Sequence, residues 1–323
     1  MSGMEQAAKG GQAMSAEQRQ QLASFWTGPL HWDVDMGEFC TLRTGGPAEA
    51  LLKATSLPEL CRLITWLEER TIRWRVIGRG SNILVGSQGF AGVLIILAGE
   101  FRAIRRESAG SEQPDTGTVR VEAGCPTGRL VGWCARHGLA GLEFMAGIPG
   151  SIGGAVWMNA GAWGGEIGNF IRAVTFVDRQ GRVHEVGRPE LELSYRRMRP
   201  LRPELREAVV VEAVFALRPG NTREILDRCR ELVARRRAKQ PTGVASAGSF
   251  FKNPPGDSAG RLIEAAGLKG LQRGGAMVSP MHANFIVNTG MASAADITAL
   301  MREVQERVYH FSGIMLEPEV HLL

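Results

Sequence analysis

The sequence has few features that would place the protein in a membrane or outside the cell. Its longest unbroken aliphatic run covers residues 93–98, whereas a membrane-spanning helix needs about 20 apolar residues. The first twenty residues are polar and small, without the apolar stretch of a secretory signal. The sequence therefore predicts no membrane association, and it favours a cytoplasmic protein.

Patterns of cysteine and histidine that bind metals or form disulfides are also missing. The five cysteines are odd in number and no pair has C-x-x-C spacing, while the six histidines show no H-x-H or H-E-x-x-H pattern. We therefore predict no metal site, and free buried thiols in a reducing compartment. The cysteines are Cys40, Cys61, Cys125, Cys134 and Cys229.

Two familiar nucleotide-binding signatures are absent, although glycine is abundant. No G-x-G-x-x-G opens a β-α-β unit with an acidic residue about 20 positions later, and no G-x-x-x-x-G-K-[ST] occurs. Glycine nevertheless makes up 41 of 323 residues, and ten glycines lie between residues 138 and 168. Runs of Gly, Ser and Ala leave backbone N–H groups uncovered for phosphate, although glycines also serve tight turns. Candidate anion cradles are residues 147–155, 159–162 and 78–82.

The chain is basic, with a net charge of +5. An excess of positive charge favours binding of nucleic acid or of an anionic small molecule such as a nucleotide diphosphate. The densest basic run covers residues 235–239 and ends a segment with apolar residues at helical spacing. Cations at the end of a helix complement its dipole, so the run needs no ligand to explain it. We expect a solvated helix end or an anionic ligand near Lys239, and no nucleic-acid partner.

The expected elements divide the chain into a tail and three units. Residues 1–21 are predicted to be a flexible tail, followed by units at 22–100, 101–219 and 220–323. Ser56 and Glu59 form a capping box that predicts a helix over residues 56–70. Apolar patterns predict a long helix at 293–311 and strands at 73–77, 93–97, 209–217, 284–288 and 318–322.

Three polar residues outside the glycine-rich stretches could carry chemistry. Ser249 lies in G-S-F-F-K-N-P, where its hydroxyl could act as a proton donor. Arg196 follows Ser194 and Tyr195, and Glu319 lies near the last predicted strand. From these residues alone, a turn serine, a surface cation and a solvated carboxylate are the ordinary alternatives.

Several longer segments occur in the order found in one enzyme family. They are TLRTGGPA (41–48), GRGSN (78–82), GLEFMAGIPGSIGGAVWMNAGAWGGE (141–166), SYRRMR (194–199), KQP (239–241), GSFFKNP (248–254), AGRLIEAAGLKG (259–270), SPMHANFIVN (279–288) and LEPEV (316–320). Together they closely resemble the UDP-N-acetylenolpyruvoylglucosamine reductases, flavoenzymes of bacterial peptidoglycan precursor synthesis. The segment between GSFFKNP and AGRLIE is short, and in this it resembles the family subtype that lacks the long tyrosine-bearing substrate loop.

The resemblance implies a fold, a reaction and its cofactors. The fold would be α+β, with a two-subdomain FAD-binding module of the vanillyl-alcohol-oxidase (PCMH) type at residues 22–219 and a C-terminal α+β substrate-binding domain. The protein would bind FAD non-covalently, take hydride from NADPH and reduce UDP-N-acetylglucosamine enolpyruvate to UDP-N-acetylmuramate. We expect it to act as a monomer.

The resemblance also assigns roles to individual residues. Ser249 would be the proton donor, with Arg196 and Glu319 beside the reacting enolpyruvyl group. The UDP-sugar would be held by Tyr195, Lys239, Asn253 and His282. The FAD contacts would come from Arg43, Thr44, Gly45, Gly46, Gly78, Arg79, Gly80, Ser81, Asn82, Gly147, Ile148, Pro149, Gly150, Ser151, Ile152, Gly153, Gly154, Asn159, Ala160, Gly161 and Ala162.

Two positions depart from the family pattern, and two other functions stay open. Trp163 stands where tyrosine is usual, which puts a hydroxyl contact to substrate in doubt, and Met198 stands where serine is usual. One rival is another FAD oxidoreductase on the same fold that uses oxygen. A histidine-linked flavin would favour it, but no histidine lies in the glycine-rich cradle. The other rival is a non-enzymatic nucleotide-binding or nucleic-acid-binding protein, which colourless purified protein would favour.

Overall fold

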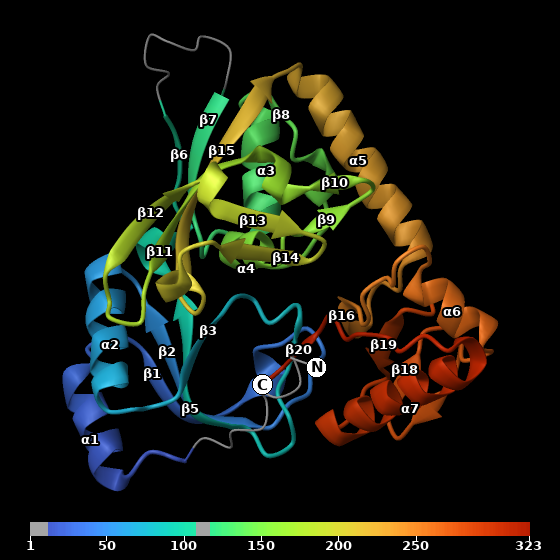
Figure 1. The fold of residues 1–323 in the computed structure, drawn as a ribbon, viewed down its shortest axis with the longest axis horizontal. Helices are drawn as coiled ribbons and strands as arrows, with labels where there is room; N and C mark the ends of the chain where they lie inside the picture. The colour runs from blue at the N-terminus through green and yellow to red at the C-terminus, as the bar shows by residue number, and fades with distance from the viewer. Residues whose placement is uncertain (1–11, 108–116) are drawn as a thin grey trace.

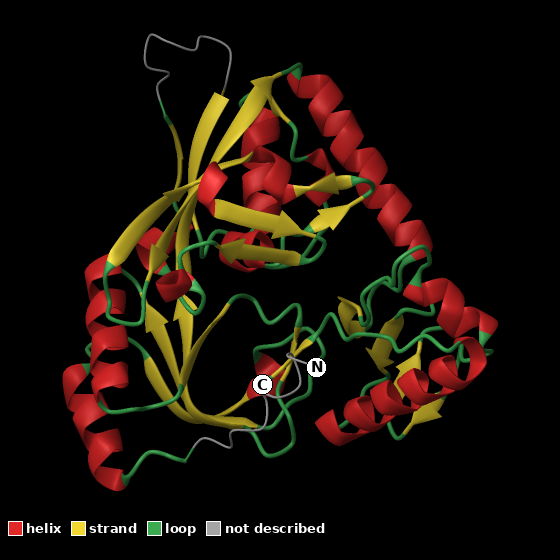
Figure 2. Cartoon of the chain, viewed as in Figure 1, coloured by secondary structure: helices red, strands yellow, loops and turns green. Residues whose placement is uncertain are grey.

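The computed structural model describes residues 12–107 and 117–323 as units in which helices cover small sheets (Figure 1; Figure 2). This mixture of helices and strands confirms the predicted α+β class. The first eleven residues of the predicted tail lie outside the described residues. Among the described helices, none is both long and apolar enough to cross a membrane.

The first unit contains, in chain order, α1 (Ala16–Phe25), β1 (Leu30–Asp35), β2 (Pro47–Ala54), α2 (Leu57–Glu69), β3 (Trp74–Ile77), β4 (Ile83–Leu84) and β5 (Phe90–Leu97). Its sheet has the order β1-β2-β5-β3, in which β2, β5 and β3 are parallel and β1 is antiparallel. Parallel strands need crossover connections, and α2 lies in the one between β2 and β3. The capping box at Ser56 and Glu59 is present, which confirms this predicted helix.

Helix α1 begins inside the segment predicted to be a flexible tail. The Ser15 side chain accepts a hydrogen bond from Gln18 N, and the Gln18 side chain accepts one from Ser15 N, so the two form a capping box. The helix buries Leu22 completely. Met14 N also donates to Glu49 Oε1 at 2.8 Å. Residues 12–21 therefore belong to the first unit, and the tail prediction is wrong for this part.

The second unit contains β6 (Ile104–Arg106), β7 (Gly117–Glu122), α3 (Thr127–Arg136), β8 (Leu139–Ala140), α4 (Ile152–Trp157), β9 (Gly161–Ala162), β10 (Gly165–Glu166), β11 (Ile171–Val177), β12 (Val183–Gly187), β13 (Leu191–Ser194), β14 (Arg197–Pro200) and β15 (Val209–Pro219). The main sheet has the order β12-β11-β15-β7-β6, with β8 also paired to β15. The hairpins β9–β10 and β13–β14 lie outside this sheet. Short 3-10 helices cover Met36–Glu38, Gly99–Arg102, Glu143–Met145, Ile167–Phe170, Arg188–Glu190 and Pro203–Leu205.

Helix α5 (Thr222–Lys239) packs against the second unit, although the sequence placed it with the third. Its half-buried residues Cys229 and Val233 contact the core that fills the first two units. Figure 1 shows the helix running along the second unit toward the third. The spacing of apolar residues in the sequence predicts this helix, but it does not indicate against which unit the helix packs.

The third unit contains β16 (Ala245–Ser249), α6 (Ala259–Ala265), β17 (Gln272–Arg273), β18 (Ala276–Val278), β19 (Phe285–Asn288) and α7 (Ala294–Ser312). Its antiparallel sheet has the order β16-β19-β18-β17. Ser293 and Asp296 cap α7, and Gly313 ends it at φ +72°, a conformation that favours glycine. These limits confirm the long helix predicted at 293–311.

The last strand, β20 (His321–Leu322), ties the third unit back to the first. It is shorter than the predicted strand at 318–322, and it pairs in parallel with β4. Leu42 and Leu84 of the first unit also share a core with the third unit. The loops near β4 therefore lie against the residues that follow Leu316.

The cysteines are free, as predicted. Cys40, Cys125 and Cys134 are buried, whereas Cys61 and Cys229 are half-buried. Burial raises the pKa of the Cys134 thiol to about 12. Burial also raises the pKa of the other four thiols, so all five are protonated near neutral pH.

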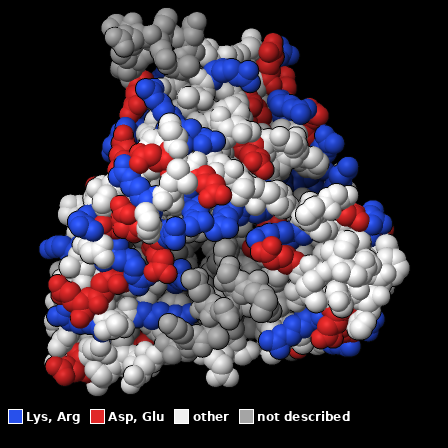
Figure 3. All heavy atoms as spheres, viewed as in Figure 1, with Lys and Arg blue, Asp and Glu red and all other residues white. Residues whose placement is uncertain are grey.

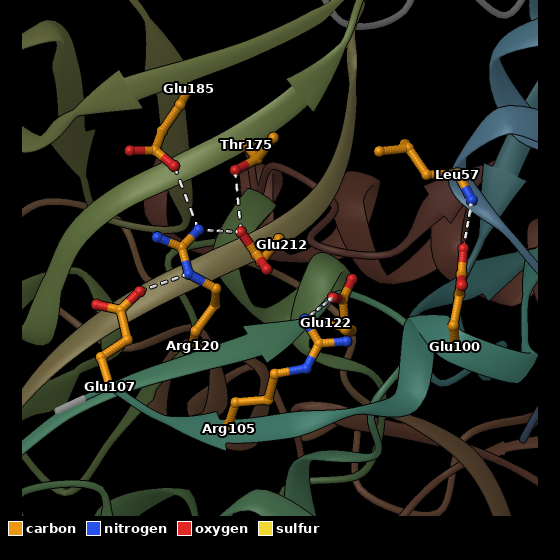
Figure 4. A network of polar contacts seen from close by, with 9 residues as sticks. All are labelled: Leu57, Glu100, Arg105, Glu107, Arg120, Glu122, Thr175, Glu185 and Glu212. Carbon is orange, nitrogen blue, oxygen red and sulfur yellow. Dashed lines mark hydrogen bonds and ion pairs between the residues drawn. The ribbon is translucent and has the colours of Figure 1, made fainter.

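A network of charged side chains covers one face of the second sheet (Figure 4). Arg120 on β7 contacts three carboxylates, those of Glu107, Glu185 and Glu212. Glu122 lies directly opposite Glu212 in the pairing of β7 with β15. Burial beside this like charge raises the pKa of Glu122 to about 7, although Arg105 at 3.9 Å opposes the effect.

We expect Glu122→Gln to stabilise the protein at high pH. The pKa of Glu122 is about 7 in the folded chain against 4.5 for the free side chain, so its contribution to stability is lost as pH rises from about 4.5 to about 7. The neutral amide carries no such penalty. The free energy of unfolding in urea should be nearly equal for both proteins at pH 4, and on the order of 3 kcal/mol larger for the variant at pH 8. A difference that does not change with pH would contradict this account.

Candidate functional site

Arg196 and Glu319 form a largely buried ion pair. Arg196 Nε donates to Glu319 Oε1 at 2.8 Å, and their side chains are 19% and 14% exposed. Arg196 occupies the turn between β13 and β14 with φ +58°, which is uncommon for a residue other than glycine. The surrounding contacts hold this turn in place, because Asn159 Nδ2 donates to Ser194 O at 2.9 Å.

The environment of Glu319 acts on its protonation in two directions. Burial raises the pKa of the Glu319 carboxyl, while the positive charges of Arg196 and Lys252 lower it. The net direction is upward, so the carboxyl keeps a proton at higher pH than an exposed glutamate does. Glu319 can therefore both orient the Arg196 guanidinium and, when protonated, donate a hydrogen bond.

Ser249 ends β16 beside the segment that carries Glu319. It is half-buried and pairs with Phe285 of β19. The next residue, Phe250, accepts a hydrogen bond from Glu319 N at 2.9 Å, and Phe251 forms a bridge with Pro318. The three predicted catalytic residues thus come from segments in direct contact. They were far apart in the sequence, since 123 residues separate Arg196 from Glu319.

Two of the predicted substrate residues meet at the same place. Asn253 N donates to the Tyr195 hydroxyl at 3.3 Å, which joins the loop after β16 to the turn that carries Arg196. Asn253 Oδ1 accepts a hydrogen bond from Ala259 N at 3.1 Å. The Asn253 side chain therefore also caps α6. Lys239 is exposed at the last residue of α5.

His282 lies further along the third unit, against the first turn of α6. Its ring carbon Cε1 would lie 3.4 Å from a Cβ at Gly260. Burial lowers the pKa of His282, so the ring is neutral at physiological pH. Its Nδ1 accepts a hydrogen bond from Asn284 N at 3.2 Å, which leaves Nε2–H as the donor. His282 could therefore offer a ligand a hydrogen bond but no positive charge.

The predicted cofactor loops of the first and second units lie side by side. Ser81 Oγ donates to Pro149 O at 3.3 Å. A Cβ at Gly78 would come within 2.5 Å of Ser151 Oγ. On its other side, the 78–82 loop contacts the loop before β2, where Thr41 N donates to Gly80 O at 2.9 Å. The loops at 39–46, 78–82 and 147–151 therefore form one continuous surface.

Backbone donors on this surface suit an anionic cofactor. Within the described ranges, no protein acceptor is paired with the N–H groups of residues 79–82. Consecutive free N–H groups of this kind bind phosphate, so the loop fits the diphosphate of FAD. At α4, by contrast, Ile152 N and Gly153 N already donate to Cys125 O and Ala123 O. Those two amides hold α4 against the second sheet and are not available to a ligand.

Asn82 and Asn159 have structural partners in addition to their predicted cofactor role. Asn82 Nδ2 donates to Glu319 O at 3.0 Å, which joins the cofactor loop to the candidate catalytic segment. Asn159 is buried. Its Nδ2 donates hydrogen bonds to Glu166 Oε2 and Ser194 O, and its Oδ1 accepts one from Gly168 N. With both side-chain atoms partnered, Asn159 positions the Arg196 turn. Sequence reasoning missed this role, since only its position before a glycine-rich hairpin was visible.

Charges on the molecular surface are mixed. Figure 3 shows basic and acidic side chains interspersed over the face in view, without one continuous basic surface. Among the residues that the structure describes, no group of three or more His, Cys, Asp or Glu side chains could hold a metal ion.

Two family models match complementary parts of the chain. The model for the FAD binding domain matches residues 48–187. The model for the UDP-N-acetylenolpyruvoylglucosamine reductase C-terminal domain matches residues 240–323. These matches confirm the predicted combination of an FAD-binding module with a C-terminal domain.

Relatives and a solved structure resemble nearly the whole chain. The UDP-N-acetylenolpyruvoylglucosamine reductase of Alkalilimnicola ehrlichii is 44% identical over 311 residues, covering 96% of this chain and 98% of the relative. That of Syntrophus aciditrophicus is 40% identical over 305 residues, covering 94% and 95%. The crystal structure of the UDP-N-acetylenolpyruvylglucosamine reductase from Thermus caldophilus is similar with a TM-score of 0.75 and 39% identity, covering 91% of this chain and 98% of that one.

Proposed function

The chain belongs to the UDP-N-acetylenolpyruvoylglucosamine reductase family, a family of FAD-dependent oxidoreductases, and we propose that it reduces UDP-N-acetylglucosamine enolpyruvate to UDP-N-acetylmuramate. The observation that carries this proposal is the buried pair of Arg196 and Glu319, 2.8 Å apart and in contact with the segment that follows Ser249. A fixed cation suits the reduction of an enolpyruvyl ether, because negative charge develops on the substrate.

We propose that the continuous surface of the three loops holds FAD. The free N–H groups of residues 79–82 would bind the diphosphate. Residues 43–46 and 147–151 would line the rest of the site. Bound FAD would accept hydride from NADPH and supply it to the substrate. The absence of histidine from these loops supports non-covalent binding.

The residues around Arg196 would manage the charge and the proton. Hydride addition to the terminal carbon of the enolpyruvyl group leaves negative charge on the neighbouring carbon and its carboxylate. The Arg196 guanidinium, oriented by Glu319, would stabilise that charge. The Ser249 hydroxyl would then give its proton to the neighbouring carbon. Tyr195, Lys239, Asn253 and His282 are our candidates for holding the UDP-sugar.

Several finer assignments follow from the proposed reductase function. We propose that the protein acts as a cytoplasmic monomer in peptidoglycan precursor synthesis and thereby in cell-wall growth, cell shape and division. We also assign it to the subtype without the long tyrosine loop. In support, only residues 255–258 lie between GSFFKNP and the first residue of α6.

We expect the purified protein to be yellow and to release its flavin on denaturation, because no residue of the cradle can form a histidyl link. Anaerobic addition of NADPH should bleach the visible spectrum. Addition of UDP-N-acetylglucosamine enolpyruvate should then restore the colour. A colourless protein that binds no added FAD would contradict the proposal. Colour that returns only with oxygen would indicate instead an oxidase on the same fold.

A further inference from the structure

Arg236 is the inward-facing member of the basic run at the end of α5. Its Nη1 donates to Gln240 Oε1 at 3.1 Å. Its Nε and Nη2 are buried and have no partner. The neighbouring Arg235 and Arg237 are exposed. Burial lowers the pKa of Arg236, which fits a guanidinium held away from solvent without a counter-charge.

The unpartnered edge of Arg236 lies beside the cofactor cradle. A Cβ at Gly147 would be 3.2 Å from Arg236 Cδ and 3.4 Å from its Nε. Gly147 has φ +78°, so the loop passes the guanidinium in a conformation that favours glycine. The ring of Trp163 lies 5.9 Å from the guanidinium carbon, and Trp163 Nε1 is also buried without a partner.

The orphaned donors are concentrated at this one place. Of the four buried side-chain atoms without a partner among the described residues, three belong to Arg236 and Trp163. All three are N–H groups that can only donate. A buried donor without an acceptor is costly, and an acceptor brought by a ligand would satisfy these groups.

We propose that Arg236 and Trp163 together bind a negatively charged phosphate oxygen of a bound diphosphate. The Nε–H and Nη2–H groups share one edge of the guanidinium, which suits two-point contact with phosphate. The inference rests on the proposed function, under which both FAD and the UDP-sugar bring a diphosphate. The Trp163 indole N–H can only donate a hydrogen bond, so its partner must be an acceptor such as a phosphate oxygen.

The test compares two dissociation constants in the purified holoprotein. Flavin fluorescence after dilution gives the dissociation constant of FAD, and the change in the bound flavin spectrum on titration with UDP gives that of UDP. Arg236→Met should raise at least one of them by about 10-fold or more, the range for losing a hydrogen bond from a charged group. The dissociation constant for Arg236→Lys should lie between those of wild type and Arg236→Met, since lysine keeps the positive charge but cannot make the two-point contact of a guanidinium. The ligand affected identifies the diphosphate.

Two further variants make the result interpretable. Trp163→Phe keeps an aromatic ring beside Arg235 and Arg236 and removes the indole N–H, so it should weaken binding of the same ligand as Arg236→Met. Arg237→Met removes the same charge from an exposed position and should stay within about twofold of wild type. The proposal is overturned if Arg236→Met matches Arg237→Met for both ligands. Failure of the proposed function is seen separately, as a wild-type protein that binds neither FAD nor UDP.

Discussion

Replacing Ser249 by alanine should slow the oxidative half-reaction, in which the enolpyruvyl substrate restores the flavin colour, by roughly 100-fold or more. Reduction by NADPH should stay nearly intact, because that hydride transfer needs no proton from this serine. The change removes one hydroxyl at the end of β16, a half-buried position. Stopped-flow absorbance of the flavin measures both half-reactions in the same sample.

Two other variants separate a proton donor from a merely structural serine. Ser249→Cys should retain more activity than Ser249→Ala, because a thiol can still donate a proton. Ser246→Ala makes the same deletion elsewhere on β16, where Ser246 pairs with Val287, and it should leave both half-reactions unchanged. If Ser249→Ala slows both half-reactions equally, the serine is structural. If it slows neither, another group is the acid.

Replacing Arg196 by methionine should slow the same oxidative half-reaction by about 100-fold to 1,000-fold, the range for losing one group that stabilises developing negative charge. It should also change the pH dependence. Arg196 is the main influence that lowers the pKa of Glu319 against the effect of burial. Without the cation, the pKa of Glu319 rises further, so the step in the pH–rate profile due to this carboxyl should move to higher pH.

Arg197 supplies the matched control for this prediction. It follows Arg196 directly, is exposed at the start of β14 and carries the same charge. Arg197→Met should therefore keep the wild-type rate and pH profile. If Arg196→Met is slow but keeps the wild-type pH profile, then Arg196 does not act through the pKa of Glu319. Equal rates for the two variants would remove Arg196 from the reaction.

Much of the local structure was predictable because local signals decide it. The capping box at Ser56 and Glu59 and the apolar face of residues 57–69 gave α2 nearly to the residue. The start of α1 has the same kind of signal at Ser15 and Gln18. It was overlooked because the helix buries only Leu22, so its apolar pattern is weak.

Long-range contacts of the site were not predictable from local patterns. Family motifs identified Ser249, Arg196 and Glu319 as a set, but no spacing reveals that Arg196 and Glu319 pair across 123 residues. The packing partner of α5 was missed for the same reason. The structural role of the Asn159 amide could not be predicted either, because its partners at Glu166, Ser194 and Gly168 meet only in the folded chain.

The pairing of β20 with β4 has a consequence for how the protein acquires its site during synthesis. Asn82, in the proposed cofactor loop, donates a hydrogen bond from its side chain to the backbone carbonyl of Glu319, which the ribosome adds 237 residues later. His321 N also donates to Asn82 O at 3.0 Å. Contacts between residues so distant in sequence form late, because the intervening chain must first be ordered. The proposed cofactor loop is thus translated early but gains these supporting hydrogen bonds only after the third unit has been made.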